Sequence, residues 1–137
     1  MNLDALTNRI KLHEGYSESP YKDHLGNWTV GWGHLIHDYI TSHERHEAWL
    51  EADISRSVHE AQRWLGSVWD DLSDTRREVV VELFFQLGGP RARSFKRFKA
   101  EVVAGDLFKA ALELRDSRWY QQVPVRAGEM IGLWEKG

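Results

Sequence analysis

Apolar side chains recur at three- and four-residue steps in two parts of the first 66 residues, which is the period of an amphipathic helix. The first series predicts a short helix that stops at Gly15. Its repeating positions are Leu3, Leu6, Ile10 and His13. The second series predicts a long helix that begins at the capping sequence over 41–44 and stops at Gly66. Its apolar positions are Leu50, Ile54, Val58, Ala61 and Leu65.

Between these helices the pattern changes to the alternation of a strand. The polar run over 24–27 predicts a hairpin turn, and a strand follows it. In that strand Thr29, Gly31 and Gly33 would share one face, because side chains alternate faces. Glycine inside a strand marks close approach by a ligand or another backbone, so this nearly bare face is expected to approach a ligand. In the alternative interpretation the two glycines only permit a bulge.

The rest of the chain is predicted to be helical. A cap at Ser73 or Asp74 begins a helix over 73–87 that is apolar nearly all round, and Gly88-Gly89-Pro90 ends it. Shorter helices are predicted over 94–103, over 106–115 and from about 125. We expect 137 residues to form a single domain with a self-sufficient core, divided into about 1–40, 41–66 and 67–137.

Two carboxyl groups lie in different surroundings near the predicted turn. Glu14 is in the last turn of the first helix, where partial negative charge on the carbonyl ends favours a protonated carboxyl group. Asp23 lies outside the helix and is expected to stay ionised. Glycoside hydrolysis requires such a pair, because one group protonates the leaving oxygen and the other acts on the anomeric carbon or on a water. Residues 14–34 are therefore predicted to contain an active site.

Composition excludes several classes of chemistry. There is no cysteine, so no disulfide, thiolate catalysis or Cys-based zinc site is expected. The chain has seven histidines, but His43-Glu-Arg-His46 lacks the spacing of a zinc-binding helix. We therefore predict no metal site and no cofactor. The N-terminus lacks an apolar run, so we expect no signal peptide, no membrane insertion and accumulation in the cytoplasm.

Charge is distributed unevenly along a chain whose net charge is −3. Lys and Arg outnumber Asp and Glu by five over 89–126, whereas 1–88 carries an excess of seven acids. The basic part could attract an acidic polymer, or it could be a solvated helix face. Its cations cluster over 91–99 without a recognised nucleic-acid motif, so no nucleic-acid partner is predicted.

The stretch from Glu14 to His34 resembles the active-site motif of the phage T4-type lysozymes, the endolysin muramidases of glycoside hydrolase family 24. That motif has a Glu, a carboxylate nine positions on and a Thr six positions later, which Glu14, Asp23 and Thr29 match. Two distant stretches also resemble the family, namely Phe84-Phe-Gln-Leu-Gly88 and Ser117-Arg-Trp-Tyr-Gln-Gln-Val-Pro-Val-Arg-Ala127.

The resemblance implies a mainly α, lysozyme-like α+β fold. A small antiparallel hairpin sheet lobe and a helical lobe would be joined by the long helix, with the substrate cleft between them. The implied reaction is hydrolysis of the β-1,4 bond between N-acetylmuramic acid and N-acetylglucosamine in bacterial peptidoglycan. A monomer is expected, made in the host bacterial cytoplasm and dependent on a separate factor, such as a holin, to reach the wall.

Residue roles also follow from the resemblance. Glu14 would be the general acid, Asp23 would assist water attack or stabilise an oxocarbenium-like state, and Thr29 would hold the water, on an inverting course. His34 would form a structural pair with Asp53. Substrate contacts are implied at Leu35, Phe85, Gln86 and Arg126, and this arginine would reach the catalytic glutamate.

Some features depart from the family pattern. The segment between His34 and the long helix is shorter by about a couple of dozen residues, which predicts a trimmed sheet lobe. Phe98 and Glu113 stand where the family often has small or amide side chains. Two other functions therefore stay open. A lytic transglycosylase would use Glu14 alone, and a wall-binding or phage structural module would not catalyse any reaction.

Overall fold

The computed structural model describes residues 1–36 and 43–137, which form two compact units. The N-terminal unit is Asn2–Arg56, and the helical unit is Ser57–Gly137 together with Met1. The division falls within one long helix, α2 (His43–Leu65), which confirms the predicted long helix. The predicted cap residue Thr41 lies outside the described residues.

The N-terminal unit begins with α1 (Leu3–Glu14), whose bounds agree with the predicted first helix. The Asn2 side chain caps its first turn by accepting a hydrogen bond from the Ala5 N–H at 3.0 Å. Leu6 and Ile10 are fully buried, as the apolar period requires. The helix ends at Gly15, which takes φ of 70° and donates its N–H to the Lys11 carbonyl. Glu14 is thereby placed at the last helical position.

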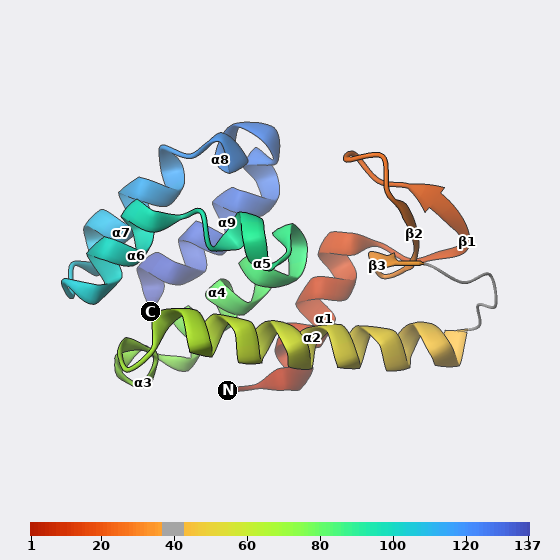
Figure 1. Ribbon diagram of the computed structural model, residues 1–137, viewed down its shortest axis with the longest axis horizontal. Coiled ribbons are helices and arrows are strands. Elements are labelled where there is room, and N and C mark those ends of the chain that lie inside the picture. Colours follow the sequence, from red (N-terminus) through yellow and green to blue (C-terminus); the bar gives the residue numbers. More distant parts are fainter. Residues whose placement is uncertain (37–42) are drawn as a thin grey trace. The chain divides into compact units, whose positions relative to one another are not determined.

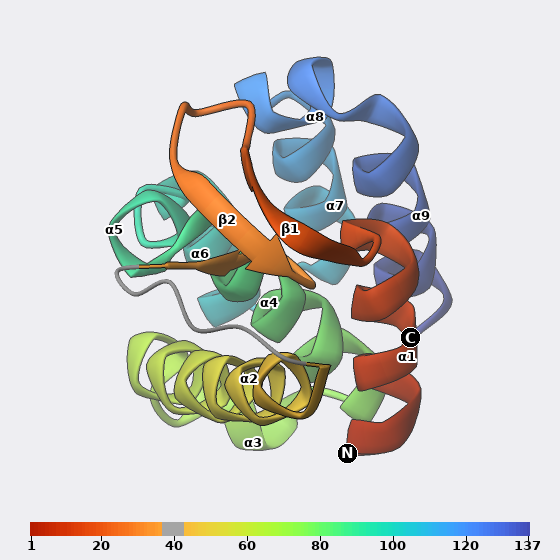
Figure 2. The ribbon, with the colours of Figure 1, turned by 90° about the vertical axis from the view of Figure 1, so that its right-hand side faces the viewer.

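Three antiparallel strands follow, in the order β1 (Ser17–Lys22), β2 (Trp28–Gly31) and β3 (His34–Leu35) (Figure 2). The predicted turn over 24–27 joins β1 to β2, and Tyr21 pairs with Thr29 across it. The predicted strand continuing through Gly33 is wrong. The chain turns back after Gly31, because Gly31 and Gly33 take φ of 65° and 71°, where strand geometry cannot continue.

In the N-terminal unit, α2 buries Leu50, Ile54 and His46. The His46 ring lies directly over Gly31, since a Cβ placed on that glycine would be 2.8 Å from the His46 Cγ. The sequence predicted that a ligand or another part of the chain approaches Gly31 closely. In the structure the His46 ring, from the same unit, occupies that position. In the helical unit the same helix buries Ala61 and Leu65 and then ends before Gly66, as predicted.

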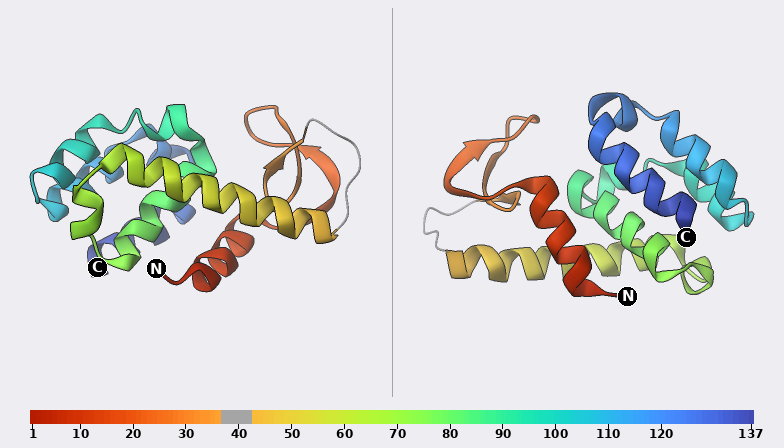
Figure 3. Two further views of the ribbon diagram at one scale, coloured as in Figure 1. Left: turned by 60° about the horizontal axis from the view of Figure 1, so that its bottom comes forward. Right: turned by 180° about the vertical axis from the view of Figure 1, so that it is seen from behind.

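The rest of the helical unit contains the central helix that the sequence predicted, capped by Ser73, and a series of shorter helices around it (Figures 1 and 3). The predicted helices agree with the structure within two residues at each end, whereas the helices of four or five residues (α3, α5 and α8) were not predicted, because they are too short to show a period. The bounds are α3 (Val68–Asp71), α4 (Asp74–Leu87), α5 (Gly89–Ala92), α6 (Lys96–Val103), α7 (Leu107–Arg115), α8 (Arg118–Gln122) and α9 (Pro124–Lys136).

Within this unit α6 packs along α7, and α9 packs against α4, α7 and α8 (Figure 3). Aromatic side chains fill the core between them. Trp134 is fully buried, and its ring meets that of Phe98 edge-on at 5.0 Å between centroids. The structure is a mainly helical α+β fold of the lysozyme type. Among the residues described, no helix combines the length and apolar character needed to cross a membrane.

Candidate active site

The Glu14 side chain approaches the backbone of Gly33 closely. A Cβ built on Gly33 would lie 2.6 Å from Oε2 of Glu14 and 2.9 Å from its Cδ. The carboxyl group therefore lies directly over the backbone of Gly33, where any side chain would displace it. The turn between β2 and β3 thus leaves room for the carboxyl group at the end of α1.

The charges of both candidate carboxyl groups act on the Tyr21 phenol. Burial raises the pKa of the Tyr21 phenol above 10.0, and the negative charges of Glu14 and then Asp23 raise it further. Both carboxylates therefore act on this phenol, which keeps its proton at neutral pH. An O–H donor near two carboxyl groups can orient either of them.

Asp23 is held by the turn that it precedes. Its Oδ1 accepts hydrogen bonds from the N–H groups of Leu25 at 2.9 Å and Asn27 at 2.8 Å. Its backbone N–H donates to the Asn27 carbonyl, which closes the turn. One carboxylate oxygen is thus fixed by backbone donors.

Thr29 is buried, with 2% of its surface exposed. Its hydroxyl donates to the Asn27 carbonyl at 2.9 Å, so its lone pairs remain able to accept a hydrogen bond. Tyr21 lies opposite Thr29 in the neighbouring strand, and so does Leu35 on the other side. Paired residues in antiparallel strands share a face, so these three side chains project from the same face of the sheet. Leu35 is half exposed there.

His34 lies beside Asp53, with 2.6 Å between Nδ1 and Oδ2. The other Asp53 oxygen accepts a hydrogen bond from Arg56 at 2.8 Å. The imidazole also stacks on Trp49, with 4.3 Å between ring centroids and 13° between planes. The arrangement attaches β3 to α2 within the N-terminal unit.

The remaining predicted site residues belong to the helical unit. Phe85 and Gln86, at the end of α4, are partly buried, and the Gln86 Oε1 accepts a hydrogen bond from the Trp119 indole N–H at 3.0 Å. Arg126 donates through Nε to the fully buried Glu82 at 3.1 Å. Contact of Arg126 with Glu14 stays a prediction, because the two residues belong to different units.

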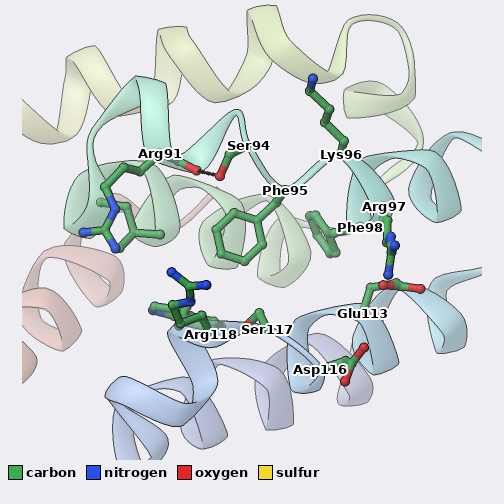
Figure 4. Close-up of a pocket in the computed structure, with 12 residues that line it drawn as sticks. Arg91, Ser94, Phe95, Lys96, Arg97, Phe98, Glu113, Asp116, Ser117 and Arg118 are labelled. Carbon is green, nitrogen blue, oxygen red and sulfur yellow. Dashed lines mark hydrogen bonds between the residues drawn. The ribbon is translucent and has the colours of Figure 1, made fainter.

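The helical unit contains a cavity of about 510 Å³ between α5, α6 and the α7–α8 segment (Figure 4). Phe95 projects into the middle of the view, with the guanidinium groups of Arg91 and Arg118 on one side and the acids Glu113 and Asp116 on the other. Phe98 and Glu113, which depart from the family pattern, both line this cavity. Its lining thus combines aromatic rings with charges of both signs.

No group of three or more His, Cys, Asp or Glu side chains in the described part of the chain is arranged to hold a metal ion. His37, one of the histidines considered in the sequence, is outside the described residues.

A family sequence model described as Phage lysozyme matches residues 11–135. The chain belongs to the phage lysozyme family. Probable T4-type lysozyme 2 of Dictyostelium discoideum is 26% identical over 164 aligned residues, covering 98% of this chain and 96% of that protein. The alignment has 164 positions and this chain has 137 residues, so the homologue contains residues that have no counterpart in this chain.

Two phage proteins are also similar to this member of the phage lysozyme family. Peptidoglycan hydrolase gp36 of Pseudomonas phage phiKMV is 32% identical over 129 residues, which cover 86% of this chain and 14% of that protein. SAR-endolysin of Enterobacteria phage P21 is 28% identical over 107 residues, which cover 77% of this chain and 63% of that protein. These similarities and the family support a cell-wall-degrading lysozyme, a hydrolase of the glycosidase type.

Two residues of this phage lysozyme's candidate site were missed as site residues by sequence reasoning. Tyr21 lies inside the motif stretch from Glu14 to His34, but no local pattern marks it, because the influence of Glu14 on it depends on the fold. Gly33 was assigned to a strand face that approaches a ligand, whereas it faces Glu14. For Gly33 the Gly-x-Gly pattern was a usable signal, since two glycines so close together also fit a tight turn.

Proposed function

We propose that this phage lysozyme hydrolyses the β-1,4 bond between N-acetylmuramic acid and N-acetylglucosamine in peptidoglycan. The observation that carries the proposal is the position of the Glu14 carboxyl group against the Gly33 backbone. The charges of Glu14 and Asp23 also both act on the Tyr21 phenol. A two-carboxylate hydrolysis needs both groups near one reacting bond. The names of the phage relatives, a peptidoglycan hydrolase and an endolysin, agree with this substrate.

In the proposed reaction Glu14 protonates the leaving glycosidic oxygen. Asp23, with Oδ1 fixed by two backbone donors, has its other oxygen to assist water attack or to stabilise the positive charge of the oxocarbenium-like state. Thr29 accepts a hydrogen bond from the attacking water through a lone pair, since its own proton is donated to Asn27. Attack from the face opposite the leaving group gives the inverting course.

Substrate is proposed to contact Leu35 in the N-terminal unit and Phe85, Gln86 and Arg126 in the helical unit. Gln86 keeps its amide N–H groups for an N-acetyl or hydroxyl oxygen, because its contact with Trp119 uses only Oε1.

The test is clearing of outer-membrane-permeabilised bacterial cells by the purified protein beside Glu14→Gln and Asp23→Asn. We expect clearing by the wild type and a loss of at least about a hundredfold in each variant, since each removes a group that acts in the transition state. Mass spectrometry of the released muropeptides should show products that have gained one water.

The same experiment separates the other functions. An anhydro product, with activity lost only in Glu14→Gln, would identify a lytic transglycosylase and exclude hydrolysis. Wall binding without clearing would identify a non-catalytic module. We further propose that the biological role is host cell lysis, with a separate factor giving access to the wall. Deletion of the gene from its phage should delay lysis if this role is correct.

A further inference from the structure

A run of cations in the helical unit is not used by the proposed reaction. Residues 90–100 contain five Lys and Arg side chains and no acid. The whole chain has a net charge of −3, so its overall charge opposes association with an anionic surface. Any such association must come from a local group of cations.

Three of these cations line a second hollow, of about 520 Å³. Arg93, Lys96 and Lys99 surround it, and its remaining lining residues are Trp64, Ala100 and Val103. None of the six is acidic. We call these six residues the α6 surface. It places a concentrated positive charge beside an apolar and aromatic floor.

Three side chains of the α6 surface face solvent along one side of the helix, one of them charged and two apolar. Lys96, Ala100 and Val103 are spaced by four and three residues and are exposed, so they lie along one side of α6. Val103 keeps 56% of its surface exposed, which is high for a branched aliphatic side chain. A cation therefore stands at one end of this row and an uncovered apolar side chain at the other.

The indole of Trp64 is held in place from within the helical unit. Its ring stacks with Phe98 at 6.5 Å and meets Phe84 at 5.5 Å between centroids. The Lys99 ammonium lies 5.5 Å from the same ring. The indole that forms the floor of the surface thus packs against core aromatic rings, and the Lys99 ammonium lies over it.

The nearby acids do not lie within the α6 surface. Figure 4 shows the Lys96 side chain extending away from Glu113 and Asp116, which lie at the opposite side of that view. Glu60 is the acid that approaches Arg93, since both side chains end close to Gly89. Lys96 and Lys99 therefore supply most of the positive charge available to a ligand.

We propose that the α6 surface binds the phosphate groups of an anionic phospholipid bilayer, so that the protein associates peripherally with membranes. At a bilayer surface anionic phosphates lie next to aliphatic chains, which matches cations beside Trp64 and Val103. A nucleic acid or a polyphosphate would pair with the cations but leave Val103 unused. The proposal is independent of peptidoglycan hydrolysis, and its test does not measure activity.

The experiment is cosedimentation with vesicles of phosphatidylcholine alone and of phosphatidylcholine mixed with phosphatidylglycerol. The wild type should sediment with the mixed vesicles only, and salt should release it. Lys96→Gln combined with Lys99→Gln should weaken binding on the order of 30-fold, at about 1 kcal/mol per cation. The matched control, Lys22→Gln combined with Lys136→Gln, has the same net charge and should bind within about threefold of the wild type.

A second pair of variants tests the apolar part. Val103→Ser should weaken binding to the mixed vesicles, whereas Phe108→Ser should not, because Phe108 is 74% exposed but does not line the hollow. Circular dichroism of each exposed-site variant verifies that the fold is retained. The proposal is overturned by equal losses in the two lysine pairs, by failure to sediment with the mixed vesicles, or by binding to duplex DNA without binding to vesicles.

Discussion

Gly33 has no side chain at a position where any side chain would displace the carboxyl group of the proposed general acid, Glu14. Gly33→Ala should lower clearing activity by at least about tenfold, because the new methyl group would occupy the place of the Glu14 carboxyl group. The measurement is the clearing rate of permeabilised cells at equal concentrations of folded protein.

The matched control for this variant is Gly66→Ala. Gly66 has a similar φ of 64°, but nothing lies within 4 Å of a Cβ at that position. Both variants should lose about 1 kcal/mol of stability through backbone strain, and only Gly33→Ala should lose activity beyond that effect. Equal activity in the two variants would contradict the assigned contact.

Tyr21 is predicted to orient the two carboxyl groups. Tyr21→Phe removes an O–H donor without changing the ring, so it should lower kcat about three- to tenfold and leave KM nearly unchanged. The acid side of the pH–rate profile should also move, because a group near Glu14 and Asp23 has been changed. Tyr120→Phe in the helical unit is the control, and an identical effect there would remove Tyr21 from the site.

His46 is a buried group whose charge affects stability. Burial, then the neighbouring His43 and His34, lower the pKa of His46 below 6.5, and Glu18 acts in the opposite direction. Tyr16 meets its Nδ1 at 2.9 Å, and its Nε2 is buried with no hydrogen-bond partner among the described residues. A proton on this ring would leave a buried N–H unsatisfied.

The sign of the resulting pH effect follows from linkage. Above pH 6.5 His46 is neutral in both states, so its contribution is fully present. As the pH falls below 6.5 the unfolded chain binds a proton that the folded chain does not, and the free energy of unfolding drops by at most about 1.4 kcal/mol per pH unit. Urea unfolding above and below that pH should show a smaller drop in His46→Gln than in the exposed-site control His59→Gln.

At the scale of elements, the stability of α4 depends on the side chain that caps its first turn. Ser73 is the N-cap of this helix, and its hydroxyl accepts a hydrogen bond from the Arg76 N–H at 3.2 Å. Ser73→Ala should therefore destabilise the protein by about 1 kcal/mol. Ser55→Ala, at an exposed position inside α2, should stabilise it slightly because alanine has the higher helix propensity. Chemical denaturation measures both, and a cost shared by the two variants would argue against the cap.

The β2–β3 turn shows how two elements combine to make a site. Gly31 and Gly33 reverse the chain within three residues, so that His46 packs over one glycine and Glu14 over the other. A helix of the N-terminal unit contributes each of these side chains. The turn thus fixes the sheet to both α1 and α2 through backbone that carries no side chain.

At the scale of the whole molecule, charge should govern the approach to the wall. Residues 89–126 carry an excess of five cations in a chain of net charge −3. If the basic part attracts the acidic polymer, clearing should decrease steadily as salt is raised, whereas hydrolysis of a neutral soluble oligosaccharide should stay constant. Clearing that rises with salt would show instead that the net negative charge dominates by repelling the wall.

Much of the fold followed from the sequence, because its signals are local. The helical period together with capping and stop residues placed α1, α2, α4, α6, α7 and α9. The helices at α3, α5 and α8 did not follow, since four or five residues are too few to show a period. The spacing of Glu14, Asp23 and Thr29 was also readable, because it is a distance along one stretch of chain.

Contacts between distant residues were decided by tertiary structure. The sequence identified Gly31 and Gly33 as places of close approach, but only folding determined that His46 and Glu14 fill them. Tyr21 is close to Asp23 in the sequence, but the charge of Glu14 acts on it as well because folding brings the two residues together. The physical reason is that a period or a cap depends on neighbours along the chain, whereas burial and electrostatic fields depend on groups that folding brings together.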